Sequence, residues 1–263
     1  MLAKRRQSVI LAEIRRSGSV RVGDLSLRFG VSDMTIRRDL SDLARQGLIE
    51  KVHGGALLSD AVSRIEPGFE AKTEWDPEAK DEIARAAAAL VRPGTAIALS
   101  AGTTTHALAR HLLRVQRLTV VTNSVRVADV FEEARRPDRT GPVVVLTGGV
   151  RTPSDALVGP IAALALCDLH VDQVFMGCHG IDPDAGLTTP NLAESETNRA
   201  LMECASQVIV LADHSKWGMV SLSSYAPLSA VDTLVTDEAM PVVIREAAAG
   251  AVGRLVVATD PAG

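Results

Sequence analysis

The sequence predicts an α/β protein in which an N-terminal winged helix-turn-helix precedes a larger domain built on a parallel β-sheet. Two patterns indicate this: helical apolar spacing broken by a tight turn near the N-terminus, and short apolar runs that alternate with helical segments from Lys80 onward. A length of 263 residues is consistent with two domains. We expect a first domain over residues 1–56, a linker over 57–78 and a second domain over 79–263.

Composition indicates a globular, cytoplasmic protein. Hydrophobic residues make up 46% of the chain and charged residues 23%, which favours a folded core over long disorder. No apolar run approaches the ~20 residues that span a bilayer, and Glu13, Arg15 and Arg16 interrupt any N-terminal export signal. The three cysteines are scattered and include no Cys-x-x-Cys pair. We therefore expect no disulfide framework, no metal site, no cofactor and no membrane partner.

Charge is divided unevenly along the chain. Residues 1–56 carry 11 Lys and Arg against 6 Asp and Glu, whereas the remaining residues carry 17 against 26. A small basic domain on an acidic body suits binding to nucleic acid, because neutralisation of phosphates supplies most of the nonspecific affinity for DNA.

The N-terminal domain is predicted to begin with three helices. Ile10, Leu11 and Ile14 share one face of the first, which ends near residues 17–18. A second short helix is expected over residues 24–29, and after a turn at residues 30–31 the third begins, with Ser32 as its N-cap. This order of elements is typical of a helix-turn-helix.

The third helix carries the candidate DNA contacts. Ile36, Leu40 and Leu43 fall on one face and are expected to pack against the first two helices. The opposite face is the part that enters the major groove in helix-turn-helix proteins, although an ordinary solvated charged face is the alternative. The predicted contacts from this region are Ser32, Met34, Thr35, Arg37, Arg38, Ser41 and Arg45.

Residues 48–52 and 53–55 predict two short strands around a wing. Lys51 and His53 are candidates for phosphate contacts, and His53 is explained equally well as a turn residue. Because helix-turn-helix heads bind paired half-sites, one copy per chain predicts a homo-oligomer, either a dimer or a tetramer.

Seven apolar runs in the second domain predict the strands of the parallel sheet. They are residues 96–99, 118–121, 143–147, 173–176, 208–212, 233–236 and 255–258. Residues 57–78, with two prolines and no clear period, are expected to be a linker.

Polar loops follow several of these strands and are expected to share one edge of the sheet. Ligands of open α/β sheets bind at the carboxyl ends of the strands. Gly102 and the three threonines after it open a helix, whose free N–H groups would face a phosphate. Lys216 follows another strand and would supply positive charge there, although a surface lysine is the alternative.

The run Val31–Leu40 (VSDMTIRRDL), followed by Leu48-Ile49 and His53-Gly54-Gly55-Ala56, resembles the signature of the DeoR family of bacterial regulators. Members are mostly repressors of sugar-catabolism genes. The resemblance implies binding to a double-stranded DNA operator. It also implies a sensor domain, similar to ribose-5-phosphate isomerase, that takes a phosphorylated sugar or a related small effector.

The resemblance extends to the effector pocket. Ser100 stands where the family often has Asp, so this chain lacks a carboxylate that could bind a sugar hydroxyl. The effector-binding residues that the resemblance implies are Ser100, Gly102, Thr103, Thr104, Thr105, Asn123, Ser124, Gly148, Gly149, Gly180, Asp182 and Lys216.

Three rival interpretations make different demands on the residues. An isomerase or deaminase would need pocket carboxylates, for which Asp182, Glu194 and Glu196 are candidates; residues 179–183 keep one carboxylate where isomerases carry three, so no catalytic residues are expected. The six histidines lack ligand spacing for a metal. An activator would use the same DNA contacts as a repressor, and operator position decides between them.

Overall fold

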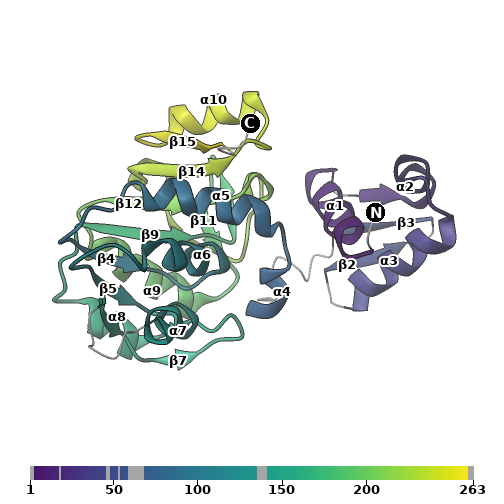
Figure 1. Ribbon diagram of the computed structural model, residues 1–263. Helices are drawn as coiled ribbons and strands as arrows, with labels where there is room; N and C mark the ends of the chain where they lie inside the picture. Colours follow the sequence, from purple (N-terminus) through teal and green to yellow (C-terminus); the bar gives the residue numbers. More distant parts are fainter. Residues whose placement is uncertain are drawn as a thin grey trace. The chain divides into compact units, whose positions relative to one another are not determined.

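The computed structural model describes residues 3–17, 19–45, 48–52, 54–58, 68–134 and 141–259. The chain divides into two compact units, Met1–Glu66 and Pro67–Gly263 (Figure 1). The first unit is a winged helix-turn-helix and the second is an α/β domain on a parallel sheet, so the predicted fold class is confirmed. No helix in the described ranges has the length and apolarity to cross a bilayer.

The N-terminal unit packs three helices against a small antiparallel sheet. Ile10, Ile14, Ile36 and Leu40 form its core and are almost fully buried, as their helical spacing predicts. The strand β1, which was not predicted, pairs with β3 and completes the sheet order β1-β3-β2. The elements are α1 (Ala3–Ser17), β1 (Ser19–Arg21), α2 (Val22–Phe29), α3 (Asp33–Arg45), β2 (Ile49–Val52) and β3 (Gly55–Leu58).

Local chemistry sets the turn between α2 and α3. Gly30 adopts the left-handed conformation, with φ of 62°, and ends α2. The Ser32 hydroxyl then accepts the Thr35 N–H at 3.3 Å, which confirms Ser32 as the cap of α3.

A seven-stranded sheet forms the centre of the C-terminal unit, in the order β15-β14-β12-β9-β4-β5-β6. Every adjacent pair is parallel, and each strand matches one of the seven predicted apolar runs within a residue or two. The strands are β4 (Ala96–Leu99), β5 (Thr119–Thr122), β6 (Val143–Leu146), β9 (Gln173–Gly177), β12 (Val208–Leu211), β14 (Thr233–Asp237) and β15 (Leu255–Ala258).

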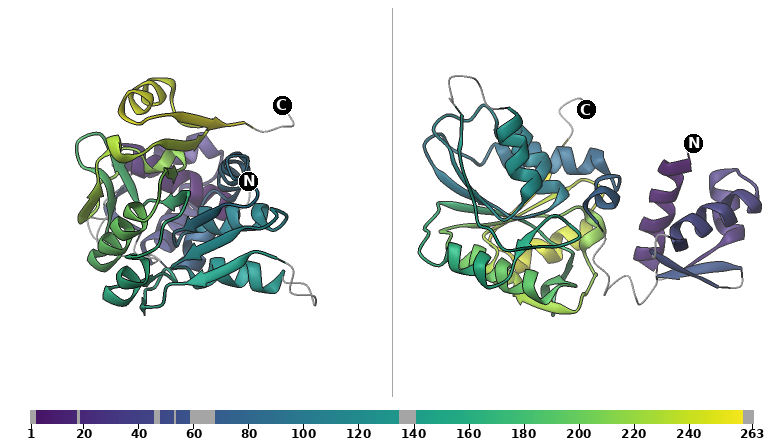
Figure 2. Two further views of the ribbon diagram at one scale, coloured as in Figure 1. Left: turned by 90° about the vertical axis from the view of Figure 1, so that its left-hand side faces the viewer. Right: turned by 90° about the horizontal axis from the view of Figure 1, so that it is seen from below.

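Helices cover both faces of this sheet, as the right-hand view of Figure 2 shows. Alternate residues of each strand point to opposite faces: Ile97 and Leu99 pack under one layer and Ala98 under the other. The first layer holds α5 (Pro77–Ala88), α6 (Thr103–Leu112) and α7 (Val125–Glu133). The second holds α8 (Pro160–Leu166), α9 (Leu192–Glu203) and α10 (Val242–Ala251).

Smaller elements, none of which was predicted, complete the unit. An antiparallel sheet of order β10-β11-β13 lies against the α9 layer, and β7 and β8 form a two-stranded ladder. Their bounds, with those of the short helices, are β7 (Val150–Arg151), β8 (Leu157–Val158), β10 (Gly180–Asp182), β11 (Gly186–Thr189), β13 (Ser223–Ala226), α4 (Phe69–Thr73), η1 (His214–Lys216) and η2 (Leu228–Ala230).

The segment predicted as a linker contains regular structure. Strand β3 continues to Leu58, and α4 and the start of α5 lie before residue 79. Buried Phe69 and a proline at the first turn of α5 explain the two helices, because they give this region both a packing residue and a helix start.

Candidate functional site

Helix α3 presents the predicted DNA-contacting face to solvent. Arg37, Arg38 and Arg45 are exposed, and Met34 is 76% exposed. Thr35 and Ser41 are half-buried at the edges of this face. Among the described residues Arg37 and Arg38 make no side-chain ion pair, so both guanidinium groups face solvent ready for base edges or phosphates.

The wing strand β2 contributes one further cation to this face. Lys51 is exposed, and its Nζ donates to Ser41 Oγ at 2.8 Å, which places a wing ammonium beside the middle of α3. Ser32, also exposed, combines its predicted position near DNA with its role as cap. His53, the other predicted wing contact, lies outside the described residues.

A buried ion pair holds α3 against α1 from behind. Arg6 Nε donates to Asp39 Oδ2 at 2.6 Å, and Gln7 donates to Asp39 Oδ1 at 3.0 Å. Both charged side chains are less than a tenth exposed. Asp39 lies on the inner face of α3, whereas the neighbouring Arg37 and Arg38 point outward, and this role of Asp39 was not predicted.

The sheet of the C-terminal unit contains a topological switch between β4 and β9. From β4 the chain builds outward through β5 and β6, then crosses back to β9 and builds the other way through β12, β14 and β15. The connections after β4 and β9 therefore leave in opposite directions and open a crevice at the carboxyl ends of these strands. The pocket lies there: Gly102 and Thr103 follow β4 and line it together with Cys178, which follows β9.

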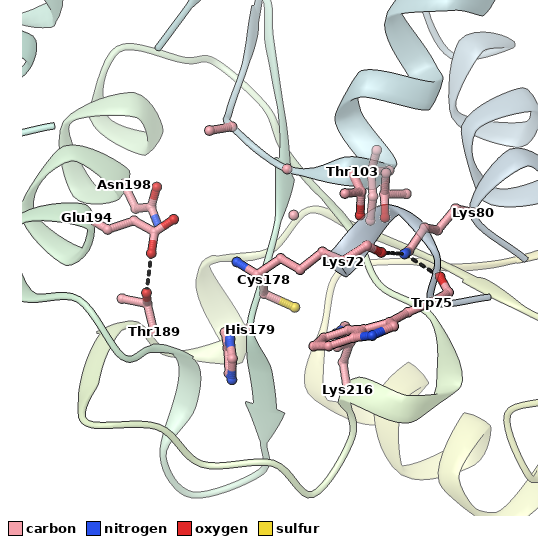
Figure 3. A pocket seen from close by; sticks show the side chains of 15 residues that line it. Lys72, Trp75, Lys80, Thr103, Cys178, His179, Thr189, Glu194, Asn198 and Lys216 are labelled. Carbon is pink, nitrogen blue, oxygen red and sulfur yellow. Dashed lines mark hydrogen bonds between the residues drawn. The ribbon is translucent and has the colours of Figure 1, made fainter. Parts of the chain in front are cut away.

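The start of α6 forms one side of the pocket (Figure 3). Gly102 precedes the helix, and Thr103 and Thr104 are its first residues. The first N–H groups of a helix have no partner within it and lie at the positive end of the helix dipole, so this arrangement favours an anion.

Basic side chains line the adjacent wall. Lys72 comes from α4 and Lys216 from the end of η1, with Lys216 Nζ 5.8 Å from the centre of the Trp75 ring. Figure 3 shows the Lys72 side chain extending across the pocket. Lys80 is almost fully buried, and its ammonium donates to the carbonyls of Lys72, at 2.5 Å, and of Trp75. The wall thus combines two cations that reach the pocket with a third that fixes its backbone.

The opposite wall is polar and partly acidic. Thr189 ends β11, and its hydroxyl donates to Glu194 Oε2 at 2.5 Å. Glu194 and Asn198 come from α9, whose first turn is capped by Asn191. These oxygens and amide groups suit the hydroxyl groups of a ligand whose anionic end lies at α6.

The structure brings four of the twelve predicted effector residues to the pocket lining: Gly102, Thr103, Thr104 and Lys216. Three others support the loop after β4 from behind. Ser100 Oγ accepts the Gly177 N–H at 3.1 Å, Thr105 donates to the Gly102 carbonyl at 3.0 Å, and Asn123 accepts the Ala101 N–H at 2.9 Å.

The remaining predicted residues serve the fold in the structure. Ser124 caps α7 through the Val127 N–H, and Asp182 accepts the N–H groups of Asp184 and Ala185 in the turn after β10. Gly149 and Gly180 permit close approach of another backbone segment. A Cβ at Gly149 would lie 2.6 Å from the Val158 carbonyl oxygen, and a Cβ at Gly180 would lie 2.2 Å from the Met219 carbonyl oxygen. Gly148, with φ of 75°, lies beside Gly149 outside the lining.

Eleven lining residues were not among the predicted effector contacts. Lys72 and Trp75 lie in the segment predicted as a linker, and Thr189 belongs to a strand that no pattern revealed. For Lys72 and Trp75, the available sequence signal was a lysine and a tryptophan just before an amphipathic helix. The others are Lys80, Ala101, Gly177, Cys178, His179, Glu194, Asn198 and Leu211. Of these, Glu194 was predicted only as a candidate catalytic carboxylate.

Acidic side chains surround η1, and two of them, Asp213 and Asp237, are buried. Burial raises the pKa of Asp213, but the charge of Lys216 and a hydrogen bond from Ser215 lower it to about 2. His214 Nδ1 lies 2.7 Å from Asp237 Oδ2, and this hydrogen bond raises the pKa of His214. Burial and the nearby charge of Asp213 raise the pKa of Asp76. These acids therefore place negative charge near Lys216 at the edge of the pocket.

Cys178 provides no activated nucleophile in the pocket. Burial raises the pKa of its thiol to about 12, so the group is protonated at neutral pH. The arrangement of residues suits binding of an anionic, hydroxylated ligand.

Comparisons with known proteins agree with both halves of this description. Residues 6–62 match the family described as DeoR-like helix-turn-helix domain, and residues 75–238 match the DeoR C terminal sensor domain. The chain is 32% identical over 250 residues to the glycerol-3-phosphate regulon repressor of Escherichia coli K12, covering 94% of this chain and 95% of the relative. It is 33% identical over 241 residues to the transcriptional repressor AccR of Agrobacterium fabrum, covering 91% of each.

Solved structures that the chain matches include a D-ribose-5-phosphate isomerase in complex with phospho-erythronic acid, with 19% identity, a TM-score of 0.40 and coverage of 54% of each chain. They also include the translation initiation factor eIF-2B of Pyrococcus horikoshii, with 16% identity, a TM-score of 0.44 and coverage of 86% of this chain and 76% of the other. The two family matches and the near full-length relatives show that the chain belongs to the DeoR family of DNA-binding transcriptional regulators.

Proposed function

We propose that this protein is a cytoplasmic repressor of a carbohydrate-catabolism operon, and that a phosphorylated sugar in the C-terminal pocket changes its affinity for the operator. The observation that carries the proposal is the meeting of three features at the switch point of the sheet: the start of α6, Lys72 and Lys216. N–H groups and two ammonium groups aimed at one space favour a dianion. The polar wall with Glu194 and Asn198 would contact the sugar hydroxyls.

DNA binding is assigned to the exposed face of α3 with Lys51 of the wing. The proposed contacts are Ser32, Met34, Thr35, Arg37, Arg38, Ser41, Arg45, Lys51 and His53. Since each chain carries one such head and operators present paired half-sites, the protein acts as a homo-oligomer.

Binding without catalysis is the role that the pocket supports. Aldose–ketose isomerisation needs a positioned carboxylate base. Asp182, the one carboxylate kept in the segment that resembles the isomerase motif, accepts two backbone N–H groups in a turn. The Cys178 thiol is protonated at neutral pH, and Glu194 accepts the Thr189 hydroxyl.

Calorimetry with a panel of ligands tests the effector class. The panel pairs each phosphorylated compound with its free alcohol or sugar, and it includes glycerol 3-phosphate because a relative is named for that regulon. We expect binding by one or more phosphorylated members and a loss of most of the binding energy in the dephosphorylated partner. Equal binding of the two partners, or binding by no phosphorylated member, would contradict the proposal.

A further inference from the structure

The basic wall of the pocket comes from the beginning of the C-terminal unit. That unit starts at Pro67, and α4 begins two residues later at Phe69. Lys72 in α4 and Trp75 just after it line the pocket. A ligand that contacts these side chains therefore contacts the part of the sensor fold that is nearest in sequence to the DNA-binding unit.

Helix α4 is held on the body by one compact set of contacts. Phe69 is 6% exposed, and its ring meets the His106 ring edge-on with a centroid separation of 5.3 Å. The Phe69 N–H donates to the Pro153 carbonyl at 3.3 Å. Arg126 of α7 lies 5.1 Å from the centre of the Phe69 ring and donates to Glu70 at 2.5 Å. Five helical residues have little stability of their own, so these contacts determine whether α4 stays in place.

Arg126 is itself fixed from the other side. Its Nε donates to Asp155 Oδ2 at 2.5 Å, and Asp155 also accepts a hydrogen bond from Arg151 at 2.7 Å. Asp155 is buried and adopts φ of 61°, a left-handed conformation that non-glycine residues rarely hold without support from their surroundings. The guanidinium group is thereby held rigidly between the body and α4.

The far end of α4 is tied to the pocket. Buried Lys80 donates to the carbonyls of both Lys72 and Trp75, while the Lys72 side chain crosses the pocket (Figure 3). An anion bound at the start of α6 can be contacted by Lys72 only while α4 is docked on the body. A ligand with this contact favours the docked arrangement, because ligands shift an equilibrium through their unequal affinity for its two states.

We propose that the segment Phe69–Trp75 couples the pocket to the DNA-binding unit, with Lys72 as the ligand contact and Arg126 as the positioning residue that holds the segment. This inference rests on the proposed function. Occupancy of the pocket stabilises docked α4, which constrains the chain that leads to the winged helix-turn-helix and lowers operator affinity. Arg126 acts through α4 and touches no ligand.

Two measurements on the full-length protein test the coupling. The ligands are inorganic phosphate and the tightest binder from the calorimetric panel, and the operator is selected from a random duplex library by the wild-type protein. In hydrogen exchange, we expect the amides of residues 69–75 to exchange more slowly with either ligand bound. In gel shifts, we expect the ligand-induced fold-change in operator Kd to be smaller in Arg126→Ala than in the wild type, by a factor of about five or more. A factor of this size lies within the usual range of coupling between two ligand sites.

Matched variants separate coupling from folding. Arg245→Ala removes an arginine that donates to two carbonyls at α10, far along the sheet, and should leave the change in operator Kd as in wild type. Arg126→Lys keeps the charge and should restore part of the change. Glu70→Gln removes only the charge of Glu70, the exposed partner of Arg126, and should act in the same direction as Arg126→Ala but more weakly. This variant still tests the coupling if Arg126→Ala unfolds.

The outcomes distinguish this inference from the proposed function. If a phosphorylated ligand binds the wild type and changes operator Kd, while exchange at residues 69–75 is unchanged or Arg126→Ala and Glu70→Gln respond as wild type, the coupling role of α4 is wrong and the proposed function stands. If no panel member binds the wild type, the proposed function fails and this inference fails with it.

Discussion

Arg37, Arg38 and Asp39 are neighbours in sequence, yet the two arginines are exposed on α3 and the aspartate is buried against α1. The 3.6-residue period of the helix produces this division. Apolar spacing was enough to predict the outward face, because Ile36, Leu40 and Leu43 fix the orientation of α3. The burial of Asp39 was not predicted, because its partner Arg6 lies 33 residues away in sequence.

Loss of Arg38 should weaken operator binding while leaving the fold intact, since its side chain is exposed. If the guanidinium group contacts a guanine through two hydrogen bonds, Arg38→Ala should cost about 1 to 3 kcal/mol of binding and relax the preference at one base pair. Arg37→Ala should have a smaller effect. Gel shifts with operator variants measure both, and unchanged affinity in the two variants would overturn the assignment of α3.

Loss of Asp39 should instead unfold the N-terminal unit. Asp39→Ala leaves Arg6 buried without its carboxylate, and breaking a buried ion pair in this way costs about 3 to 5 kcal/mol. Asp42→Ala is the control, because Asp42 is more exposed and pairs with the exposed Arg45. Denaturant unfolding of both variants checks this. Equal stabilities would show that the buried pair contributes nothing beyond a surface one.

Lys216→Ala should weaken binding of the phosphorylated ligand by tens-fold, which corresponds to about 1.5 to 3 kcal/mol for a hydrogen bond to a charged group. Operator binding by the ligand-free protein should not change, because Lys216 belongs to the other unit. Lys4→Ala, an exposed lysine of the N-terminal unit, is the matched control for ligand binding. Calorimetry measures the ligand affinity of both variants, and a wild-type affinity in Lys216→Ala would show that Lys216 does not contact the ligand.

At the scale of elements, apolar runs predicted all seven strands of the parallel sheet but not their order. Strand order depends on crossovers between distant segments, and the switch between β4 and β9 is what selects the loops that form the pocket. The loops after β5 and β6 looked equally suitable in sequence. Asn123 and Gly149 lie in them and serve the packing of neighbouring segments instead.

The short antiparallel elements could not be predicted for a different reason. Residues 180–182 and 186–189 include two glycines and two threonines among few apolar residues, so they lack the alternation typical of a strand. Their pairing arises from tertiary packing against α9 and β13. As a result, nothing in the sequence indicated that Thr189, at the end of β11, lines the pocket.

The short helix η1 makes the stability of the C-terminal unit depend on pH. The hydrogen bond to Asp237 raises the pKa of His214 above 6.5 in the folded state, with Asp213 and Asp76 adding negative charge nearby. The stabilisation is complete below about pH 6.5 and is lost as the pH rises through the folded-state pKa. His214→Gln should therefore destabilise the protein more at about pH 5.5 than at about pH 8.5 in denaturant titrations. An equal loss of unfolding free energy at the two pH values would contradict the role of this histidine.

At the scale of the whole molecule, the two compact units divide the work: the N-terminal unit carries the DNA-binding face and the C-terminal unit carries the pocket. The uneven charge of the sequence follows the same division. A fragment of residues 67–263 contains the complete seven-stranded sheet and its helices. We expect it to fold, to bind the phosphorylated ligand and to form an oligomer that does not bind DNA. Sedimentation analysis checks the oligomer, and a monomeric fragment would contradict the assignment of assembly to this unit.

The most direct test of the account is the operator affinity of the full-length protein at rising concentrations of a phosphorylated sugar and of its free sugar, measured side by side. We predict that the phosphorylated form weakens operator binding and that the free sugar at the same concentrations leaves it unchanged. We also predict that Lys216→Ala stays on the operator at sugar-phosphate concentrations that release the wild type. Equal responses to the two sugars, or a wild-type response in Lys216→Ala, would contradict a phosphate-sensing pocket that controls DNA binding.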